Sequence, residues 1–352
     1  MEILKLQLMQ NHFLFYSASF LAAIIFAYSL SPLFRWIAIR WDVMDHPSSA
    51  IKTHQRATPY LGGCAIALAF VLTLIPMRFL SSYPGGTLTP ILGILIGGAM
   101  VTLLGLIDDS VQGGLSFKKK FIIQFIASAV LILFDIQIHF IHPRWLAGLL
   151  TIVWVTGIMN AFNIIDIMDG LSGSTAVVAA LGFFFIALPT EHVYVNFVAI
   201  VLAGSILGFL PHNFCKDKKI FMGDTGSLFI GYVLAALSMG TSYSTLHNAG
   251  VLAPVLILGV PIYDTLFVML IRYKKGLSPF LGSKDHYALR LEKMGFTRLG
   301  IVGISVLAAT LLSLAAYLTT TLWFWLAVGI YICVFATAYF LGVYLAKVQI
   351  EK

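Results

Sequence analysis

The sequence predicts an all-α integral membrane protein with about 11 transmembrane helices, its N-terminus outside and its C-terminus in the cytoplasm. Composition gives the first indication. Apolar residues make up 59% of the 352 residues and charged residues only 11%, with a mean hydropathy of +0.94, which argues against a water-soluble globule. The charges are also separated by uncharged windows that reach or exceed the roughly 20 residues an α-helix needs to cross a bilayer.

The windows follow one another along the whole chain, which indicates one polytopic domain over residues 1–352. Those without any charged residue are 6–34, 57–77, 79–107, 145–165, 170–190, 192–215, 225–263 and 299–346. Six hold one span each, whereas the last folds back at Thr319 to Thr321 and holds two. The window 225–263 ends one span near Tyr243 and begins another near Gly250. The run 121–141, interrupted only by Asp135, supplies one more span.

The basic residues define the orientation. With the N-terminus outside, 19 of the 22 lysines and arginines fall on inner segments, and only Lys5, Arg78 and Arg144 fall outside. Because basic residues are enriched in cytoplasmic loops, this asymmetry predicts the topology. It also accounts for the net charge of +7 without a nucleic-acid partner. The inner segments expected to carry the site lie near 35–60, 108–120, 160–171, 212–227 and 272–299.

Carboxylates gather at the inner ends of the apolar spans. Asp108 and Asp109 close the third span. A carboxylate at a helix C-terminus opposes the macrodipole, and two adjacent carboxylates repel each other, so we expect a cationic group beside them. A solvated helix stop is the simpler alternative, but ionisable residues at membrane edges are by default functional candidates.

A second inner segment carries polar residues at every third position: Asn160, Asn163, Asp166 and Asp169. Steps of three spread these residues over half the circumference of a regular helix. The pattern therefore indicates a helix end that passes into a loop around a ligand. Hydrogen bonding of the two asparagines between helices is the alternative interpretation.

Two later segments complete the candidate site. Asp224 lies between two glycines in the stretch 221–227, just before a membrane helix. There the backbone can approach a ligand closely and free N–H groups face anions, although an ordinary turn is the alternative. The long basic loop 272–298 contains His286 and Arg290. Taken singly, His54 and His286 would more often be surface histidines than ligands.

One hard cation and one anionic substrate would explain why these groups share the cytoplasmic side. Carboxylate and amide oxygens without Cys/His clusters favour Mg²⁺, or Mn²⁺, over zinc, and the interleaved lysines and arginines favour phosphate groups. The chain has no Gly-x-x-x-x-Gly-Lys-Ser/Thr loop and no dinucleotide fingerprint, which argues against ATP-driven transport. Phosphoryl transfer is the chemistry that these residues suit.

Several motifs occur in a familiar order along nearly the whole chain. They are Asp45-His-Pro, Lys52-Thr-His54, Pro59-Tyr-Leu-Gly-Gly63, Gly105-Leu-Ile-Asp-Asp109, 120–124, 160–171, 221–226 and Pro261-Ile-Tyr-Asp-Thr265. In these motifs and in their order, the chain resembles the polyprenyl-phosphate N-acetylhexosamine-1-phosphate transferases. That superfamily contains the bacterial enzymes that start O-antigen, enterobacterial common antigen and teichoic acid linkage units, and the phospho-N-acetylmuramoyl-pentapeptide translocase of peptidoglycan synthesis.

The resemblance implies an enzyme of the bacterial inner membrane in which undecaprenyl phosphate attacks the β-phosphorus of a UDP-N-acetylhexosamine, giving a lipid diphosphate sugar and UMP. Carried over motif by motif, the resemblance assigns Asp224 and Asn163 to the metal and Lys52, Lys120 and Arg290 to phosphates. It assigns Asp108 and Asp109 to catalysis at the lipid phosphate. The residues that it assigns to the nucleotide and sugar are Asp166, Asp169, His286 and His54. We expect direct attack by the lipid phosphate, whose second pKa of about 6 leaves little need for a base. A covalent Asp nucleophile is the alternative.

Two departures from the family pattern concern the sugar. The stretch usually read Asp-Gly-x-Asp-Gly is Asp166-Ile-Met-Asp-Gly170 here, and the loop pattern His-x-His-His-Arg is His286-Tyr-Ala-Leu-Arg290. UDP-GlcNAc is the expected donor, with UDP-FucNAc or UDP-QuiNAc as the alternative. The muramoyl-pentapeptide substrate is not expected.

A secondary transporter is the competing class of protein. It would place ionisable residues near the midplane and show two similar halves, whereas here they crowd one interface and no internal repeat is apparent. A homodimer is one arrangement open to the chain, although the sequence does not specify the oligomeric state.

Overall fold

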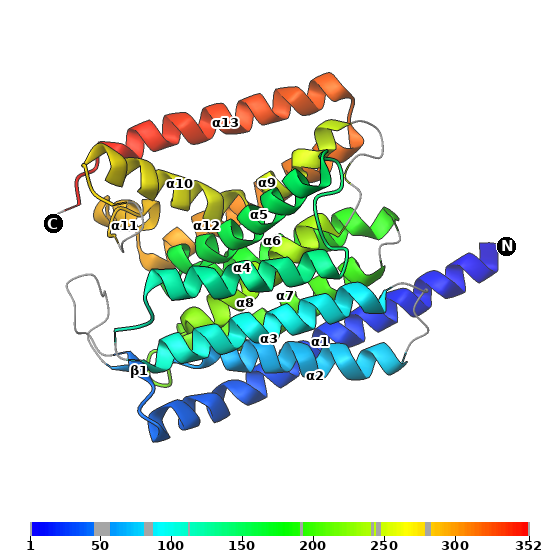
Figure 1. Ribbon diagram of the computed structural model, residues 1–352, viewed down its shortest axis with the longest axis horizontal. Coiled ribbons are helices and arrows are strands. Elements are labelled where there is room, and N and C mark those ends of the chain that lie inside the picture. Colours follow the sequence, from blue (N-terminus) through cyan, green and yellow to red (C-terminus); the bar gives the residue numbers. More distant parts are fainter. Residues whose placement is uncertain are drawn as a thin grey trace.

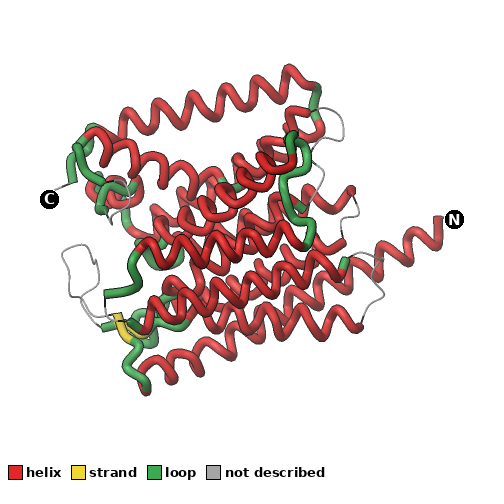
Figure 2. Tube along the Cα trace, viewed as in Figure 1, coloured by secondary structure: helices red, strands yellow, loops and turns green. Residues whose placement is uncertain are grey.

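The computed structural model describes residues 2–45, 57–80, 87–111, 113–190, 193–240, 243, 248–278 and 283–350. Long helices lie side by side in one bundle, and α1 begins at the end opposite to where α13 finishes (Figure 1). Figure 2 shows the loops gathered at the two ends of this bundle.

The long helices are α1 (Glu2–Arg40), α2 (Gly62–Leu80), α3 (Leu88–Ser110), α4 (Phe117–Leu133), α5 (Arg144–Ile165), α6 (Leu171–Ala187), α7 (Val193–Phe214), α8 (Gly223–Met239), α10 (Gly259–Lys274), α12 (Arg298–Thr321) and α13 (Phe324–Ala346). Shorter elements are α9 (Ala253–Ile257), α11 (Tyr287–Lys293) and the 3₁₀ helices Leu188–Thr190 and Asn248–Leu252.

The all-α membrane class is confirmed. Among the described residues, six helices are long and apolar enough to cross a bilayer, or up to seven if Ala249–Ile257 and Gly259–Lys274, bent by 75°, form one broken span. Gly62–Met77 and Leu171–Ala187 are shorter apolar helices. Each predicted span coincides with a helix, but not all of these helices are long and apolar enough to cross a bilayer. The count of eleven therefore stays a prediction.

The boundaries of two predicted spans can be compared directly with the structure. α4 ends at Leu133, well before Ile141, because Asp135 has a φ of 60°, a left-handed conformation that an α-helix does not continue through. The fold-back near the middle of window 299–346 is confirmed, since α12 ends at Thr321 and α13 begins at Phe324.

Within the described part of the chain, a small antiparallel ribbon departs from the all-α prediction. β1 (Met44–Asp45) pairs with β2 (Thr58–Pro59), and two-residue strands are too short to show a period-two pattern. The ribbon extends toward the start of α8, because Phe221 N–H donates to the Pro59 carbonyl at 2.9 Å and Gly63 N–H donates to the Met222 carbonyl at 2.9 Å. These bonds fix the entry into α8.

Helix α8 lies in the centre of the bundle. Its side chains are buried without interruption from Thr225 to Ser238, and it packs against α3 and α5. Tyr232 ties it to its neighbours, donating to the Gly93 carbonyl of α3 or the Ala127 carbonyl of α4 at 3.1 and 3.3 Å. A helix that is apolar all round and buried along its length is a rigid support, so the first turn of α8 is a well-fixed place for a functional group.

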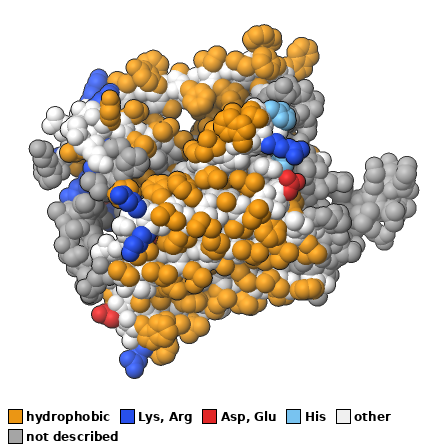
Figure 3. Space-filling model, viewed as in Figure 1, with side chains coloured by type: hydrophobic (Ala, Val, Ile, Leu, Met, Phe, Trp, Pro, Cys, Tyr) orange, Lys and Arg blue, Asp and Glu red, His pale blue; other side chains and the backbone are white. Residues whose placement is uncertain are grey.

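The outside of the bundle is apolar over its middle, and charged side chains lie toward its two ends (Figure 3). α13 is the clearest case, with Trp325 79% exposed and Phe340 69% exposed. In water such a surface would be unfavourable, at roughly 25 cal/mol for each Å² of exposed apolar area. Facing lipid it carries no such cost, so the surface agrees with the membrane class.

Candidate active site

The site is built where the inner end of α3 meets the first turn of α8. A Cβ at Gly105 would lie 2.4 Å from the Thr225 Cα, so only a glycine allows the two backbones to approach this closely. One turn further along α3, Asp109 then lies beneath the N-terminus of α8. Gly223 has a φ of 70°, and a Cβ there would meet the Asp109 carboxylate at 2.4 Å, so this position also requires glycine.

Asp109 caps helix α8 from outside. Its Oδ1 accepts from Asp224 N–H at 2.9 Å, and its Oδ2 accepts from Thr225 N–H at 3.0 Å and from Thr225 Oγ1 at 2.6 Å. The free N–H groups and the positive end of the α8 dipole stabilise this negative charge. The sequence predicted that the N–H groups at Asp224 would face an anion, and in the structure that anion is a carboxylate of the protein itself.

Lys120 is the cation expected beside the α3 carboxylates. Its Nζ lies 2.7 Å from Asp108 Oδ2 and 2.6 Å from Asp224 Oδ2, and the lysine side chain is 23% exposed. The other oxygen of Asp108 accepts from Leu115 N–H at 2.6 Å, which ties the α3–α4 loop to the site. The like charges on α3 are thereby offset by an ammonium from the first turn of α4 and by the N-terminus of α8.

Asn163 completes the group from the last turn of α5. Its Nδ2 donates to Asp224 Oδ1 at 2.8 Å and to Ser227 Oγ at 3.0 Å. After Ile165 the helix ends and Asp166 begins a loop, as the three-residue spacing predicted. Asp224 is the centre of the arrangement, because it contacts Asn163 on one side and Lys120 on the other.

The three acidic side chains Asp108, Asp109 and Asp224, here called the carboxylate cluster, fit a hard divalent cation. They offer oxygens that all lie within 4.8 Å of one another, and hard cations prefer carboxylate oxygen. Both oxygens of Asp109 are already engaged by α8, so Asp108 and Asp224 are the better-placed ligands. The Asn163 amide lies beside Asp224 Oδ1, and after a half-turn of its terminal group it would offer its oxygen to a cation bound by Asp224.

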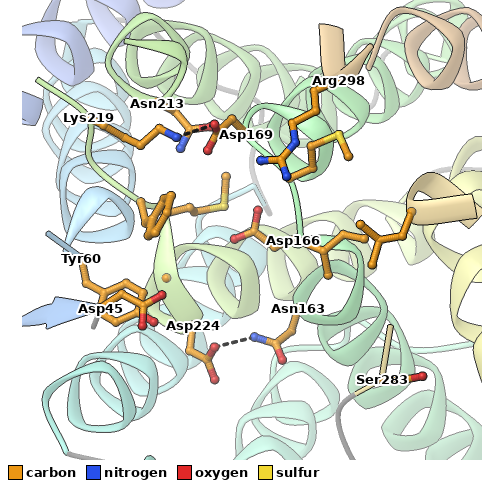
Figure 4. A pocket seen from close by; sticks show the side chains of 16 residues that line it. Asp45, Tyr60, Asn163, Asp166, Asp169, Asn213, Lys219, Asp224, Ser283 and Arg298 are labelled. Carbon is orange, nitrogen blue, oxygen red and sulfur yellow. Dashed lines mark hydrogen bonds and ion pairs between the residues drawn. The ribbon is translucent and has the colours of Figure 1, made fainter. Parts of the chain in front are cut away.

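A cleft opens beside Asp224 and Asn163 (Figure 4). Asn163 and Asp224 lie at one edge, Asp166 projects into the middle, and Asp169 and Lys219 lie along the opposite edge. Lys219 Nζ contacts Asp169 Oδ2 at 2.5 Å. The remaining lining residues are Asp45, Tyr60, Ile167, Met168, Asn213, Phe221, Met222, Gly223, Ser283, Leu289 and Arg298.

Asp166 is the acidic residue of the cleft whose protonation is most perturbed. Burial raises its pKa to about 8, and the negative charges of Asp224, Asp169 and Asp109 add to the effect. Its carboxyl group is half-buried in the loop between α5 and α6. A cation entering the cleft would favour the charged form of this group, so the cleft is suited to a ligand that carries positive charge with it.

Two predicted site residues lie elsewhere, in a group that we call the anchor cluster: Asp264, Asp285, His286 and Arg290. Arg290 is 2% exposed and donates to the carbonyls of Leu345, Ala346 and Val348 at the end of α13. His286 Nδ1 lies 2.7 Å from Asp264 Oδ2. Neither residue lines the cleft, because both are engaged in holding α11 to α10 and α13.

Their assignments to phosphate and sugar therefore lack the geometric support that the carboxylate cluster provides. Burial of His286 at 4% exposure and the full set of protein acceptors around Arg290 leave no open face toward the cleft. Lys52 and His54, the remaining predicted ligands, lie outside the described residues.

Lys219 and Arg298 are cleft residues that the functional interpretation of the sequence missed. In the sequence both residues stand out only as members of the basic inner segments. For Lys219 a signal existed, because it stands two residues before the Phe221 motif and next to the ribbon contact. For Arg298, the first residue of α12, no sequence pattern connects it with the cleft.

The fold and site together define a polytopic helical membrane protein with a phosphotransfer-type site at one end of its bundle. The sequence pattern of Glycosyl transferase family 4 matches residues 91–242. The chain is also 32% identical over 321 residues to the probable undecaprenyl-phosphate N-acetylglucosaminyl 1-phosphate transferase of Bacillus subtilis, covering 89% of this chain and 87% of the relative.

Two further relatives widen the comparison. The decaprenyl-phosphate N-acetylglucosaminephosphotransferase of Mycobacterium tuberculosis is 32% identical over 313 residues, covering 80% of this chain and 76% of the relative. The phospho-N-acetylmuramoyl-pentapeptide-transferase of Streptococcus pneumoniae is 31% identical over 237 residues, covering 62% of this chain and 69% of the relative. The chain belongs to glycosyl transferase family 4 and is an enzyme of the glycosyl-1-phosphate transferase type.

Proposed function

We propose that this enzyme transfers an N-acetylhexosamine 1-phosphate from a UDP-sugar to undecaprenyl phosphate and releases UMP. The reaction would be the first membrane step of cell-envelope polysaccharide synthesis. The observation that carries the proposal is the meeting of Asp108, Asp109, Asn163, Asp224 and Lys120, from four helices, in one group whose Asn163 and Asp224 line a cleft. The names of two relatives, which specify undecaprenyl or decaprenyl phosphate and N-acetylglucosamine, support the substrate class.

The proposed chemistry is a single displacement at phosphorus. An oxygen of the lipid phosphate forms a bond to the β-phosphorus of the UDP-sugar, and the bond from that phosphorus to the bridging oxygen breaks, so that UMP leaves with both bonding electrons. Asp224 and Asp108, with Asn163, would hold Mg²⁺ or Mn²⁺, which when bound offsets the negative charge of the diphosphate. In-line positioning of the two reactants can lower the barrier by roughly 7 to 11 kcal/mol.

The chain's own residues would position the reactants. Lys120 contacts Asp224, which lies at the edge of the cleft, and can offer its ammonium to a phosphate. Lys219 and Arg298 lie along the same cleft and supply positive charge for the nucleotide diphosphate. Asp166 and Asp169 face the nucleotide side, where carboxylates accept hydrogen bonds from ribose hydroxyls or a base.

UDP-GlcNAc is the proposed donor, in line with the N-acetylglucosamine named for the two relatives. UDP-FucNAc or UDP-QuiNAc is the alternative, because the loop bearing His286 and Arg290 lacks the histidines of the family pattern. The segment that contributes Ser283 and, from α11, Leu289 to the cleft can change which sugar fits without altering the contacts to the phosphates.

We further propose that the protein lies in the bacterial inner membrane with the cleft open to the cytoplasm. Lysines and arginines of the cleft end include Lys120, Lys219 and Arg298, whereas Arg144 begins a helix at the opposite end. Basic residues are enriched on the cytoplasmic side of membrane proteins. UDP-sugars are cytoplasmic metabolites in bacteria, so this orientation places the cleft where the donor is.

The deciding experiment supplies purified protein in detergent with undecaprenyl phosphate, Mg²⁺ and one UDP-sugar at a time, and measures UMP release. The proposal expects UMP only when the lipid phosphate is present, and fastest with UDP-GlcNAc. Fastest release with UDP-FucNAc or UDP-QuiNAc would select the alternative donor. Absence of UMP with all donors would overturn the proposal and favour a transporter.

A further inference from the structure

Lys120 occupies the place between two carboxylates that a divalent cation would take. Its Nζ contacts Asp108 Oδ2 at 2.7 Å and Asp224 Oδ2 at 2.6 Å, and these are oxygens of the two better-placed metal ligands. The opposite oxygen of Asp108 is held by Leu115 N–H, and Asp109 is held by α8. The two Oδ2 atoms are therefore the ligand atoms that the protein leaves to a mobile partner.

We propose that Lys120 is an internal counter-ion that exchanges with the divalent cation. Without metal, its ammonium bridges Asp108 and Asp224 and keeps the carboxylate cluster together. When the cation binds, Lys120 leaves both carboxylates and turns its ammonium toward the cleft, where phosphate oxygens replace its acidic partners. This inference rests on the metal site of the proposed function.

The exchange follows from charge and geometry. An ammonium and a divalent cation on the same two oxygens would lie only a few ångström apart, and like charges repel strongly where solvent is largely excluded. Both carboxylates are mostly buried, with Asp108 at 9% and Asp224 at 24% exposure. The lysine side chain can move because it has four flexible methylenes and is itself 23% exposed.

The contacts of Lys120 also reduce the repulsion among the acidic side chains in the metal-free protein. The three carboxylates within 4.8 Å of one another would repel before any metal arrives. Lys120 and the N-terminus of α8 offset this repulsion in the metal-free protein. A cluster held in this way is pre-organised for the cation, which then has no large rearrangement of the acidic side chains to drive.

The test measures metal binding and lysine reactivity in the absence of lipid and UDP-sugar. Lys120→Met is expected to bind Mn²⁺ about tenfold more tightly than the unaltered protein, because the competing ammonium is gone. Lys119→Met is the matched control: it removes the same charge from the same helix turn at an exposed position, and its Mn²⁺ affinity should stay within about twofold. Equal affinities for the two variants would overturn the proposal.

A measurement on the unaltered protein guards against a folding defect in the variant. Reductive methylation followed by peptide mass spectrometry reports how readily each lysine reacts. Saturating Mg²⁺ should accelerate modification of Lys120 several-fold and leave Lys118 and Lys119 unchanged, because the released ammonium is no longer held between the two carboxylates and is open to the reagent. An unchanged or slower reaction at Lys120 would overturn the exchange. Because no substrate is present, either result is independent of whether UMP is released.

Discussion

The carboxylate cluster and the anchor cluster lie at the same end of the bundle and are both built from buried acidic and basic groups, yet they differ in what they leave open. In the anchor cluster Asp264 is 0% exposed and Arg290 2% exposed, and their hydrogen-bonding partners belong to the protein. In the carboxylate cluster Asp224 is 24% exposed and lies at the edge of a cleft. The first arrangement is saturated, whereas the second can accept a ligand.

The comparison shows that charged residues in a membrane protein have two uses that composition alone does not separate. Arg290 places a fixed positive charge against the last carbonyls of α13, where cations stabilise a helix end. It also pairs with Asp285 at 2.9 Å and lies 5.2 Å above the Phe267 ring. Holding α11 in this way keeps Leu289 at the cleft, so the anchor cluster serves the site indirectly.

The largest effect is expected from Asp224→Asn. The substitution removes the charge that contacts Lys120 and Asn163 while keeping the size of the side chain, so UMP release should fall roughly a thousand-fold and the unfolding temperature should change little. Initial rates of UMP release, beside circular dichroism melting, measure the two quantities. Turnover close to that of the unaltered protein would remove Asp224 from the reacting centre.

Arg290→Met tests the other side of the comparison. Removing one partner of a buried ion pair costs about 3 to 5 kcal/mol, so the protein should unfold at a markedly lower temperature. Arg290 does not line the cleft. At a temperature where the variant is folded, its KM for the UDP-sugar should therefore stay close to that of the unaltered protein. An unaltered melting curve together with a much higher KM would instead indicate direct phosphate binding.

Gly105→Ala should give an intermediate effect on both quantities. The new methyl would lie 2.4 Å from Thr225 Cα, which separates α3 from α8 and costs about 1 to 3 kcal/mol through overpacking. The same separation withdraws Asp109 from the α8 N-terminus, so turnover should fall by about ten- to a hundred-fold. Gly303→Ala is the matched control, since a Cβ at that helical position meets nothing within 4 Å, and it should change neither quantity.

The smallest expected effect concerns pH. The pKa of Asp166 is raised from 3.8 to about 8 in the folded protein by burial and by the neighbouring carboxylates. The folded state therefore holds a proton that the unfolded chain releases, and stability declines progressively as pH rises from about 4 to about 8. In protein treated with a chelator, Asp166→Asn should reduce the difference in melting temperature between pH 5 and pH 8.5. An undiminished difference would show that another group is responsible.

The sequence was most informative where local chemistry is self-contained. Uncharged windows located the helices, and the glycines around Asp224 indicated a backbone open to an anion, because these signals depend on neighbouring residues alone. That Asp109, rather than a ligand, supplies this anion depends on the close approach of α3 and α8 at Gly105, which no spacing along the chain reveals.

The parts that the sequence did not predict depend on which distant helices meet. Arg290 and Lys219 are both basic residues of inner segments, and the sequence around them does not show which of the two reaches the cleft. The structure places Arg290 against the end of α13, some 55 residues further along the chain, and Lys219 against Asp169, 50 residues earlier. Burial then makes the first an anchor and the second a cleft residue.

The most direct test of the central claim is the position of a divalent ion in a crystal of the protein grown with Mn²⁺ and UDP, located by anomalous scattering. The account predicts a manganese peak about 2 Å from carboxylate oxygens of Asp224 and Asp108, with the diphosphate in the cleft beside Asp166. A peak bound only near the anchor cluster, or at the opposite end of the bundle, would contradict it.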